Sequence, residues 1–317
     1  MHESLLQLDK IRLNFSTEGL LVLNLTLAFI MFGVALGIKF EHFKELWNNK
    51  RYPILGFISQ FFVLPAVTVL VIILLNRFIT PTIALGMILV ASCPGGNISN
   101  FISALAKGNA ALSVTLTAIA TISAIVMTPF NFLFWGGVYT RFLSRFDTEG
   151  LLRPLEISPY HVFQTVFILL GIPLILGMLF NHYFPKATEK INKPIKILSI
   201  LCFTAIVLLA FKKNYDYFLL YIKYIFFIVL VHNAVGFTSG YLFSGIIKST
   251  ETIRRTIAIE TGIQNSGLAL VLLFNPKIFP TDMAIGGMAF IAAWWGIWHI
   301  LAGLSLAGFW SWRRPRG

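Results

Sequence analysis

Nine runs of predominantly apolar residues divide this chain of 317 residues. Each run is about 18 to 30 residues long, and a helix needs roughly 20 such residues to cross the hydrocarbon core of a bilayer. Membrane-spanning β-strands alternate apolar and polar residues over about ten positions, so unbroken runs favour helices. The sequence therefore predicts an all-α polytopic membrane protein with nine transmembrane helices, at about 19–38, 54–75, 82–106, 109–138, 160–184, 196–211, 217–247, 254–275 and 283–310.

The composition argues against other classes of protein. Only 12% of the residues are charged, about half the share that is usual in a soluble domain. The net charge of +12 suggests nucleic acid at first sight, but the basic residues lie in short loops between apolar runs, as in membrane proteins. Both cysteines, Cys93 and Cys202, lie inside apolar runs, which argues against a disulfide scaffold or a CxxC site. We therefore expect the lipid bilayer as a partner, no nucleic acid and no cofactor.

The basic residues also predict an orientation. If the N-terminus lies outside, 15 of the 25 lysine and arginine residues fall in the inner loops and the tail, as the positive-inside rule requires. The predicted parts are then an extracellular or periplasmic leader (1–18), spans 1–4 (19–138), an outer loop (139–159), spans 5–9 (160–310) and a basic cytoplasmic tail (311–317). The other long loop is the basic stretch 185–195. Because the first run is a full span, we expect no cleavable signal peptide.

A single acidic residue lies in the middle of a predicted span. Twelve of the 13 aspartate and glutamate residues lie in the leader, in loops or at span ends, and the exception is Glu260. A carboxylate at this depth is costly unless it is paired, solvated or neutralised. Glu260 is therefore the leading candidate for a functional residue. The simpler alternative is a structural carboxylic acid that stays protonated and hydrogen-bonded.

Two spans contain residues that interrupt a helix. The third contains CPGGN at 93–97, where proline removes a backbone donor and glycine disfavours the helix. The eighth contains TGIQNSG at 261–267, which places glycines and polar residues at membrane depth. Non-helical backbone is tolerated there only where protein buries it or where it lines a watery cavity. Freed carbonyls and half-helix ends at such places bind ions.

The positions of the two breaks indicate an inverted repeat. The break lies in the fourth of spans 5–9 and in the third of spans 1–4, so one lost N-terminal helix would make the two sets equivalent. The third span then runs inward and the eighth outward, as an inverted repeat requires. Two broken helices at matching positions are typical of a secondary transporter.

Five stretches carry a resemblance to a known family: ISQFFVLPA (58–66), CPGGNISN (93–100), ALSVTLTAIAT (111–121), VHNAVG (231–236) and RRTIAIETGIQNSGLA (254–269). On these motifs the chain resembles the bile acid:sodium symporter family, over nearly its whole length, and looks like the nine-span members. The resemblance implies a six-helix core domain, which contains the two crossed broken helices and moves against a panel domain. It also implies two Na⁺ sites behind the crossing, coupled to uptake of an organic anion.

The resemblance implies two sets of Na⁺ ligands. The first site would use Ser99, Asn100, Ser113, Thr117 and Glu260. The second would use Gln60, Glu260, Gln264 and the backbone carbonyls of Thr261 and Ile263. Oxygen ligands of this kind suit a hard cation. The alternative for each hydroxyl is a hydrogen bond to a carbonyl one turn back, and for each glutamine a contact between helices.

The substrate site is implied less specifically. Asn97 and Asn265 would meet an anion near the half-helix N-termini, between core and panel. Trp298 and His299 on the ninth span are further candidates, although a core histidine and packing tryptophans are the simpler interpretation. Ile300 stands where some relatives carry asparagine, which favours a bulky apolar anion over a small hydroxy acid.

The sequence thus predicts a symporter rather than an enzyme. It would couple inward flux of Na⁺, as two ions, to uptake of a bile-acid-like organic anion by alternating access. The nearest alternative is a proton-coupled carrier or exporter that uses Glu260 as its proton site. The chain has no GxGD motif, no HExxH motif and no second acid at mid-span depth, which argues against an intramembrane enzyme. A receptor would not need two broken helices. The short tails favour a bacterial inner membrane, although the sequon at Asn14 leaves a eukaryotic membrane open.

Overall fold

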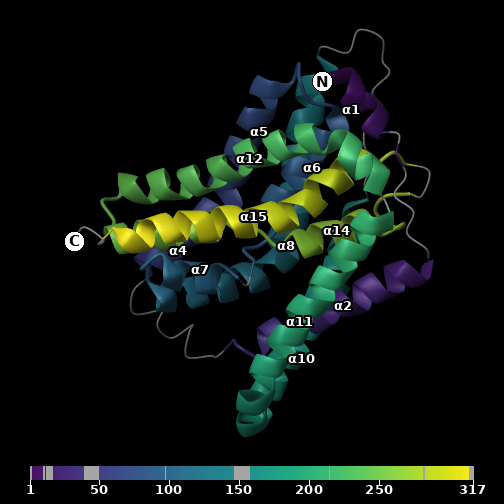
Figure 1. Ribbon diagram of the computed structural model, residues 1–317. Helices are drawn as coiled ribbons and strands as arrows, with labels where there is room; N and C mark the ends of the chain where they lie inside the picture. Colours follow the sequence, from purple (N-terminus) through teal and green to yellow (C-terminus); the bar gives the residue numbers. More distant parts are fainter. Residues whose placement is uncertain are drawn as a thin grey trace.

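The computed structural model describes residues 2–9, 11, 17–38, 50–96, 98–145, 158–213, 215–280 and 283–313. These residues form α-helices and two π-helical turns (Figure 1). In chain order the elements are α1 (His2–Asp9), α2 (Thr17–Ala35), α4 (Arg51–Ile58), η1 (Ser59–Val63), α5 (Leu64–Leu75), α6 (Pro81–Ser92), α7 (Ser99–Leu105), α8 (Ala110–Ser144), α9 (Pro159–Val166), η2 (Phe167–Gly171), α10 (Ile172–Tyr183), α11 (Pro185–Lys213), α12 (Tyr215–Ile246), α13 (Glu251–Gly262), α14 (Ser266–Leu273) and α15 (Gly286–Trp312).

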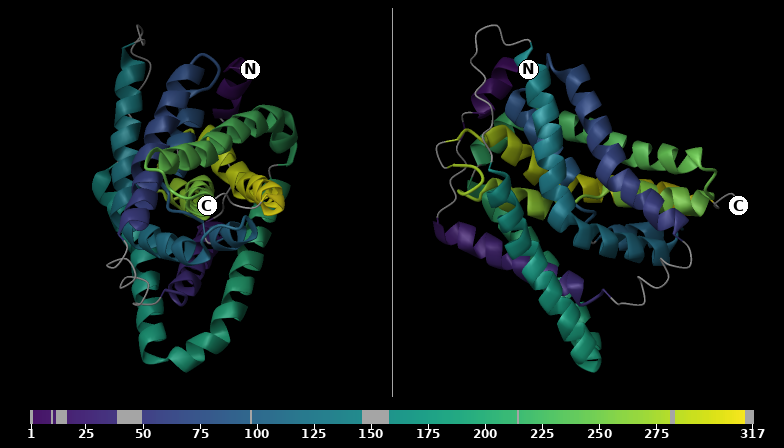
Figure 2. Two further views of the ribbon diagram at one scale, coloured as in Figure 1. Left: turned by 90° about the vertical axis from the view of Figure 1, so that its left-hand side faces the viewer. Right: turned by 180° about the vertical axis from the view of Figure 1, so that it is seen from behind.

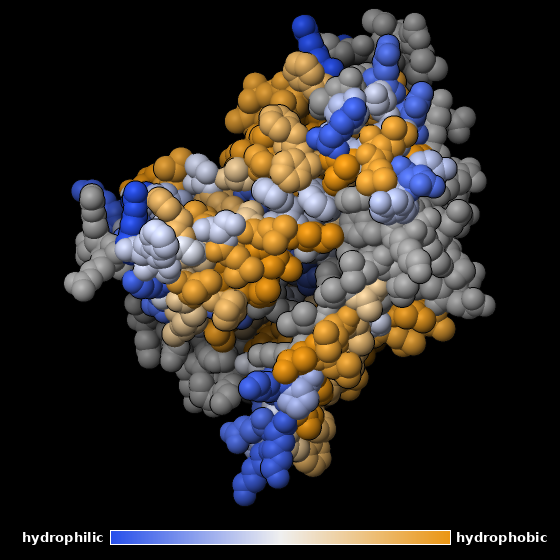
Figure 3. Space-filling model, in the orientation of Figure 1, coloured by the Kyte–Doolittle hydropathy of each residue, from blue (hydrophilic) through white to orange (hydrophobic). Residues whose placement is uncertain are grey.

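Five continuous helices are long and apolar enough to cross a membrane: Arg51–Leu75, Ala110–Ser144, Pro159–Tyr183, Leu219–Ile246 and Gly286–Trp312. Two shorter apolar helical segments, Asn24–Ala35 and Pro81–Ser92, accompany them. Large apolar side chains are exposed along these helices, as Leu70 (55% exposed) and Leu74 (71% exposed) are on α5. Apolar residues cover much of the surface in Figure 3. A helical, polytopic membrane protein is therefore confirmed.

The helices form two groups. In the larger group α12 packs against α13, and α15 packs against α6 and α14. In the smaller group α2 packs against α10 and α11, and the α10–α11 pair extends away from the rest (Figures 1 and 2). The contact of α12 with α13 is very close, since a Cβ atom on Gly240 would lie 2.8 Å from the Thr261 hydroxyl and 2.9 Å from the Ile257 carbonyl.

Two predicted loops are partly helical. The outer loop predicted from residue 139 begins later, because α8 continues to Ser144. The basic stretch predicted as a loop at 185–195 is the first part of α11. Its sequence, PKATEKINKPI, starts with proline at the first helical position and contains the good helix formers Lys, Ala and Glu, so a helix can extend beyond the apolar run even though Pro194 lies inside it. Polar composition marks the end of an apolar span, but it does not mark the end of a helix.

The predicted leader also contains structure. Leu5 and Leu8 of α1 are fully buried and belong to the main apolar core. Asp9 accepts hydrogen bonds from the hydroxyl groups of Thr80 and Thr82, at 2.9 Å for Thr80. Because these threonines lie at the start of α6, the carboxylate faces the positive end of that helix dipole.

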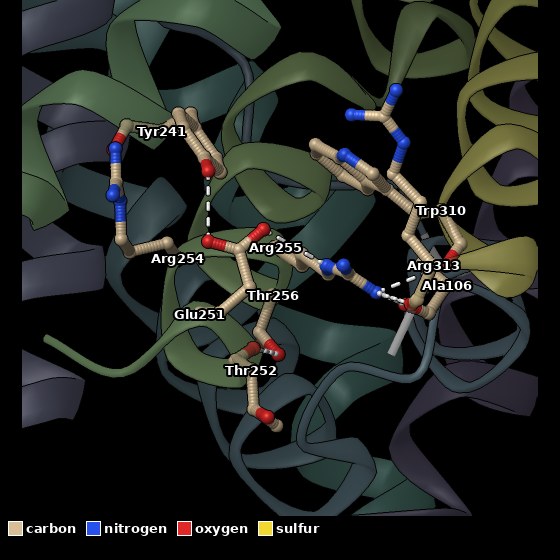
Figure 4. A network of polar contacts seen from close by, with 9 residues as sticks. All are labelled: Ala106, Tyr241, Glu251, Thr252, Arg254, Arg255, Thr256, Trp310 and Arg313. Carbon is tan, nitrogen blue, oxygen red and sulfur yellow. Dashed lines mark hydrogen bonds and ion pairs between the residues drawn. The ribbon is translucent and has the colours of Figure 1, made fainter. Parts of the chain in front are cut away.

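At the opposite end of the larger group, a buried arginine joins three helices (Figure 4). Arg255 of α13 is 2% exposed and pairs with Glu251 at 3.1 Å. Its Nη1 donates to the carbonyls of Ala106, Trp310 and Arg313 at 3.0–3.2 Å. These carbonyls lie at the C-terminal ends of α7 and α15, where a positive charge is favourable. Arg255 thereby fixes α13 relative to α7 and α15.

We expect Arg255→Met to destabilise the protein by about 3 kcal/mol, because it leaves Glu251 and three carbonyls without their buried partner. The matched control is Arg254→Met, since Arg254 is only half-buried and lies over the Tyr241 ring at 3.9 Å, a contact worth about 1 kcal/mol. Thermal unfolding in detergent measures both variants. Equal melting temperatures for the two variants would contradict the role given to Arg255.

Candidate functional site

The two interrupted spans cross at their breaks. The N–H of Gly96 donates to the Ile263 carbonyl at 2.9 Å, and the N–H of Asn265 donates to the Pro94 carbonyl at 2.8 Å. The backbone between α6 and α7 is thus paired with the backbone between α13 and α14 as a short antiparallel bridge. Each non-helical segment satisfies polar groups of the other, which allows both to lie in the protein interior.

The crossing requires small residues. A Cβ atom on Gly96 would lie 3.1 Å from the Gln264 carbonyl oxygen and 3.2 Å from Ile263. A Cβ atom on Gly95 would lie 3.3 Å from Oε2 of Glu260. The two glycines therefore let one broken span approach the backbone and the carboxylate of the other.

Four half-helices end or begin at this crossing. The helices α6 and α13 end there, and their last carbonyls give the site partial negative charge. The helices α7 and α14 begin there, and their N-terminal ends give the site partial positive charge. The crossing can therefore hold a cation against carbonyl oxygens and an anion against N–H groups.

The Glu260 carboxylate lies beside the crossing within a cluster of hydroxyl groups. Its Oε1 accepts hydrogen bonds from Ser113 and, at 2.7 Å, from Ser99. Its Oε2 accepts from Thr117 at 3.1 Å. The amide oxygen of Asn100 lies 2.9 and 3.1 Å from the same Ser113 and Thr117 hydroxyls and competes with the carboxylate for their single protons. All five side chains predicted for the first Na⁺ site therefore lie together.

Three elements supply this hydroxyl cluster. Ser99 and Asn100 open α7, Ser113 and Thr117 lie one turn apart on α8, and Glu260 lies near the end of α13. Glu260 is 4% exposed. Among the residues that the structure describes, no ion pair involves Glu260 and no group of three or more His, Cys, Asp or Glu side chains gathers to bind a metal. The cluster thus offers a carboxylate, three hydroxyls and an amide oxygen, a ligand set that suits a hard monovalent cation rather than a transition metal.

A second group of oxygens lies around two glutamines. The Nε2 of Gln60 donates to Oε1 of Gln264 at 2.8 Å and to the Cys93 carbonyl at 2.9 Å. The Nε2 of Gln264 donates to the Thr261 carbonyl at 2.7 Å. Gln60 and Gln264 are 4% and 0% exposed. These contacts bring together the glutamines and one of the two carbonyls that were predicted for the second Na⁺ site.

The remaining members of that predicted site, the Ile263 carbonyl and the Glu260 carboxylate, both lie close to Gly95. The Ile263 carbonyl accepts from Gly96, and an atom added to Gly95 would contact both this carbonyl and the Glu260 carboxylate, at 3.7 and 3.3 Å. In the part of the chain that the structure describes, no hydrogen bond joins the carboxylate to either glutamine. Glu260 therefore belongs to the hydroxyl cluster by direct contact, and it approaches the predicted Ile263 carbonyl beside Gly95.

Several residues at the site were not predicted. The Ser59 hydroxyl bonds the Thr261 hydroxyl at 2.7 Å, and Asn233 of α12 donates to the Gly262 carbonyl at 2.7 Å. Both contacts hold the end of α13, where the helix stops. A helix that stops inside a membrane leaves carbonyls that need donors. The sequence indicates that the carbonyls at the end of α13 need donors, but it does not indicate which residues provide them.

The four predicted substrate residues have different positions. Asn97 lies outside the described residues. Asn265 is half-buried and caps α14, since its side chain accepts from the N–H of Leu268 at 3.1 Å. Trp298 is half-buried and packs edge-on against Phe226 of α12 at 4.9 Å, and His299 is 5% exposed.

Two neighbouring aromatic residues are structural. His232 is fully buried and its Nε2 lies 2.8 Å from the Thr68 hydroxyl, as expected for a core histidine. Trp295, on the same helix as Trp298, is also fully buried, with its ring 4.7 Å from the His232 ring. Trp295 therefore packs in the core and does not face a substrate cavity.

Comparisons with known proteins agree with this arrangement. A sequence model of the Sodium Bile acid symporter family matches residues 24–220. The uncharacterized sodium-dependent transporter YocS of Bacillus subtilis is 32% identical over 90% of this chain and 81% of its own length. The probable sodium/metabolite cotransporter BASS1 of Arabidopsis thaliana, a chloroplastic protein, is 30% identical over 96% of this chain and 69% of its own length.

A human relative is also similar. The P3 protein of Homo sapiens is 29% identical over 82% of this chain, and the chain spans about half (52%) of the length of that protein. Proteins similar to this chain therefore occur in a bacterium, a plant and an animal.

Proposed function

Because the chain belongs to the sodium bile acid symporter family, we propose that it is a secondary active symporter that couples inward flux of two Na⁺ ions to uptake of an organic anion. One observation carries the proposal. The buried Glu260 carboxylate lies at the crossing of two broken helices within hydrogen-bond distance of three hydroxyls, and two of these hydroxyls also lie within hydrogen-bond distance of an amide oxygen. A transporter needs such a charged, oxygen-rich site at membrane depth, whereas a structural bundle does not.

The first Na⁺ ion binds in the hydroxyl cluster. Ser99, Ser113 and Thr117 now direct their hydroxyl protons at Glu260. These hydroxyls can rotate to present lone pairs to a cation, while the carboxylate supplies the negative charge that the cation requires. Asn100 Oδ1 completes the ligand set. Binding of Na⁺ thus removes the cost of a buried uncompensated charge.

The second Na⁺ ion binds between Gln60, Gln264 and the carbonyls of Thr261 and Ile263. These carbonyls lie at the C-terminal end of α13, where the helix dipole favours a cation. Glu260 belongs to the first site by direct contact, and it lies close to Gly95, as does the Ile263 carbonyl of the second site. Each Na⁺ therefore favours the same arrangement of α13 relative to the crossing, which makes the two binding events cooperative.

Nine spans in two inverted repeats form the transporter, with the larger helix group as the core domain and α2, α10 and α11 as part of the panel domain. Figure 3 shows the surface hollowed between α15 and the α10–α11 pair. We place the organic anion between core and panel near Asn97, Asn265, Trp298 and His299. Movement of core against panel then exposes this place to each side of the membrane in turn.

A bile-acid-like anion is the substrate class, and a bacterial inner membrane with the N-terminus outside is the location. The half-helix N-termini of α7 and α14 favour an anionic group. The apolar residues near Trp298 favour a bulky body attached to that group. The name of the plant relative, a sodium/metabolite cotransporter, is compatible with an organic substrate.

Thermal unfolding of the purified chain tests the proposal. Na⁺ is titrated against K⁺ at constant ionic strength and pH, alone and with a panel of bile acids and smaller organic anions. We expect Na⁺ to raise the melting temperature, and one class of anion to raise it further only when Na⁺ is present, because ligands stabilise the state they bind. Stabilisation that depends on pH and is indifferent to Na⁺ would favour a proton-coupled carrier instead.

Single substitutions at the two sites should each weaken Na⁺ activation. We expect Asn100→Ala and Gln264→Ala to raise the Na⁺ concentration for half-maximal uptake by about tenfold, the effect of losing roughly 1.4 kcal/mol of binding. Each variant should also lower the Hill slope, since Asn100 and Gln264 lie on different broken spans and in different sites. Uptake into proteoliposomes at varied Na⁺ measures both quantities. A wild-type slope and half-saturation in both variants would exclude the two-site arrangement.

A further inference from the structure

The helix that carries Gln60 has one extra residue in its turn. Within Arg51–Leu75, residues Ser59–Val63 form the π-helical turn η1. Pro65 follows this turn and explains it, because proline has no N–H to donate and its ring clashes with the carbonyl four residues earlier. Short π-helical turns are frequent at functional sites.

In a regular α-helix the N–H at position 65 would donate to the Phe61 carbonyl four residues earlier, but Pro65 has no N–H. This carbonyl accepts a hydrogen bond from Nδ2 of Asn131 at 2.8 Å. Asn131 comes from the neighbouring helix α8 and is 1% exposed. An amide from another helix thus replaces the backbone donor that the proline removed.

The turn determines where two side chains point. One residue corresponds to about 100° of rotation in an α-helix. The extra residue in η1 therefore turns Ser59 and Gln60 by about this angle relative to α5. In this orientation Ser59 reaches the Thr261 hydroxyl, and Gln60 reaches Gln264 and the Cys93 carbonyl.

We infer that Asn131 is a positioning residue for the second Na⁺ site. By donating to Phe61, it holds the π-helical turn that presents Gln60 to the break after α13. The inference rests on the proposed function, because it assigns Gln60 to a Na⁺ site. Asn131 itself does not contact the ion.

The test is a mutant cycle read by Na⁺-dependent thermal stabilisation of the full chain. Asn131→Leu keeps the branched shape and the number of side-chain heavy atoms and removes the donor. We expect it to raise the Na⁺ concentration for half-maximal stabilisation by about tenfold, because a buried carbonyl loses its partner and the turn relaxes. The same increase is expected in the Asn100→Ala background. In the Gln60→Ala background the increase should be less than about twofold, since Gln60 is the side chain through which Asn131 acts.

The matched control lies three residues away on the same helix. Thr128 is fully buried, and its hydroxyl has no hydrogen-bond partner among the described residues. Thr128→Val therefore changes a buried polar side chain of α8 without removing a hydrogen bond to η1, and we expect an unchanged Na⁺ half-saturation. If Asn131→Leu does not yield folded protein, Asn131→Gln replaces it in the same mutant cycle. Glutamine keeps the amide but moves it by one methylene away from its position next to the Phe61 carbonyl.

The outcomes separate the inference from the function on which it rests. If Na⁺ does not stabilise the wild-type chain, both the proposed function and the inference about Asn131 are wrong. A wild-type response together with an unchanged half-saturation in the Asn131 variant overturns the inference alone. An equal increase in the Gln60→Ala background also overturns it, because Asn131 then acts by general stability rather than through Gln60.

Discussion

Glu260→Gln is expected to abolish Na⁺-driven uptake. Glutamine keeps the size of the side chain and removes the negative charge that three hydroxyls and an amide surround. Removing one partner of a buried charge pair costs about 3–5 kcal/mol, and every 1.4 kcal/mol is about tenfold in affinity. Na⁺ affinity should therefore fall by at least about a hundredfold. Uptake and Na⁺-dependent thermal stabilisation of the same preparation measure the two losses.

The control for this change is Glu251→Gln on the same helix. Glu251 pairs with Arg255 and accepts a hydrogen bond from Tyr241, far from the crossing. We expect this variant to melt at a lower temperature and to keep its Na⁺ half-saturation. A folded Glu260→Gln protein with wild-type uptake and Na⁺ dependence would remove Glu260 from the ion site.

Transport is expected to be electrogenic. Two Na⁺ ions that move with one monoanion carry one net positive charge inward. A tenfold Na⁺ gradient contributes about 1.4 kcal/mol per ion, and a potential of roughly 100 mV adds about 2.3 kcal/mol for the net charge. The sum of about 5 kcal/mol supports accumulation of the anion by several thousandfold. A single Na⁺ per monoanion would be electroneutral and would reach only about tenfold under the same gradient.

Proteoliposomes measure the effect of the membrane potential. An inside-negative potential, imposed with a K⁺ gradient and valinomycin at a constant Na⁺ gradient, should accelerate uptake and raise its final level. The control omits valinomycin and keeps both ion gradients. If neither the initial rate nor the final level of uptake depends on the membrane potential, the coupling of two Na⁺ ions to one monoanion is contradicted.

The main features of the site could be predicted because each follows from a local rule. Pro94 and its two glycines cannot continue a helix, so the first break was visible in the sequence. Glu260 stood out because it is the one acidic residue at mid-span depth. The resemblance to the family then supplied the hydroxyl ligands, and the structure brings all of them to this carboxylate.

Contacts between distant segments could not be predicted in the same way. The resemblance assigns Gln60 and Gln264 to one site, but no local rule brings together two residues that are 204 positions apart in the chain. Pro65 shows that a carbonyl needs a new donor, but nothing local indicates that Asn131 provides it. Helix ends were also misplaced at 139–144 and 185–195, because charged residues stop a membrane span without stopping a helix.

Equilibrium binding of radioactive Na⁺ to the purified full chain tests the central claim most directly, since it needs no knowledge of the substrate. We expect two saturable Na⁺ ions per wild-type chain, displaced by unlabelled Na⁺ and not by K⁺. We expect no saturable binding in Glu260→Gln at the same concentrations, because both sites depend on the one carboxylate beside the crossing. Absence of saturable Na⁺ binding to the wild-type chain, or two bound ions in Glu260→Gln, would contradict a sodium symporter built around Glu260.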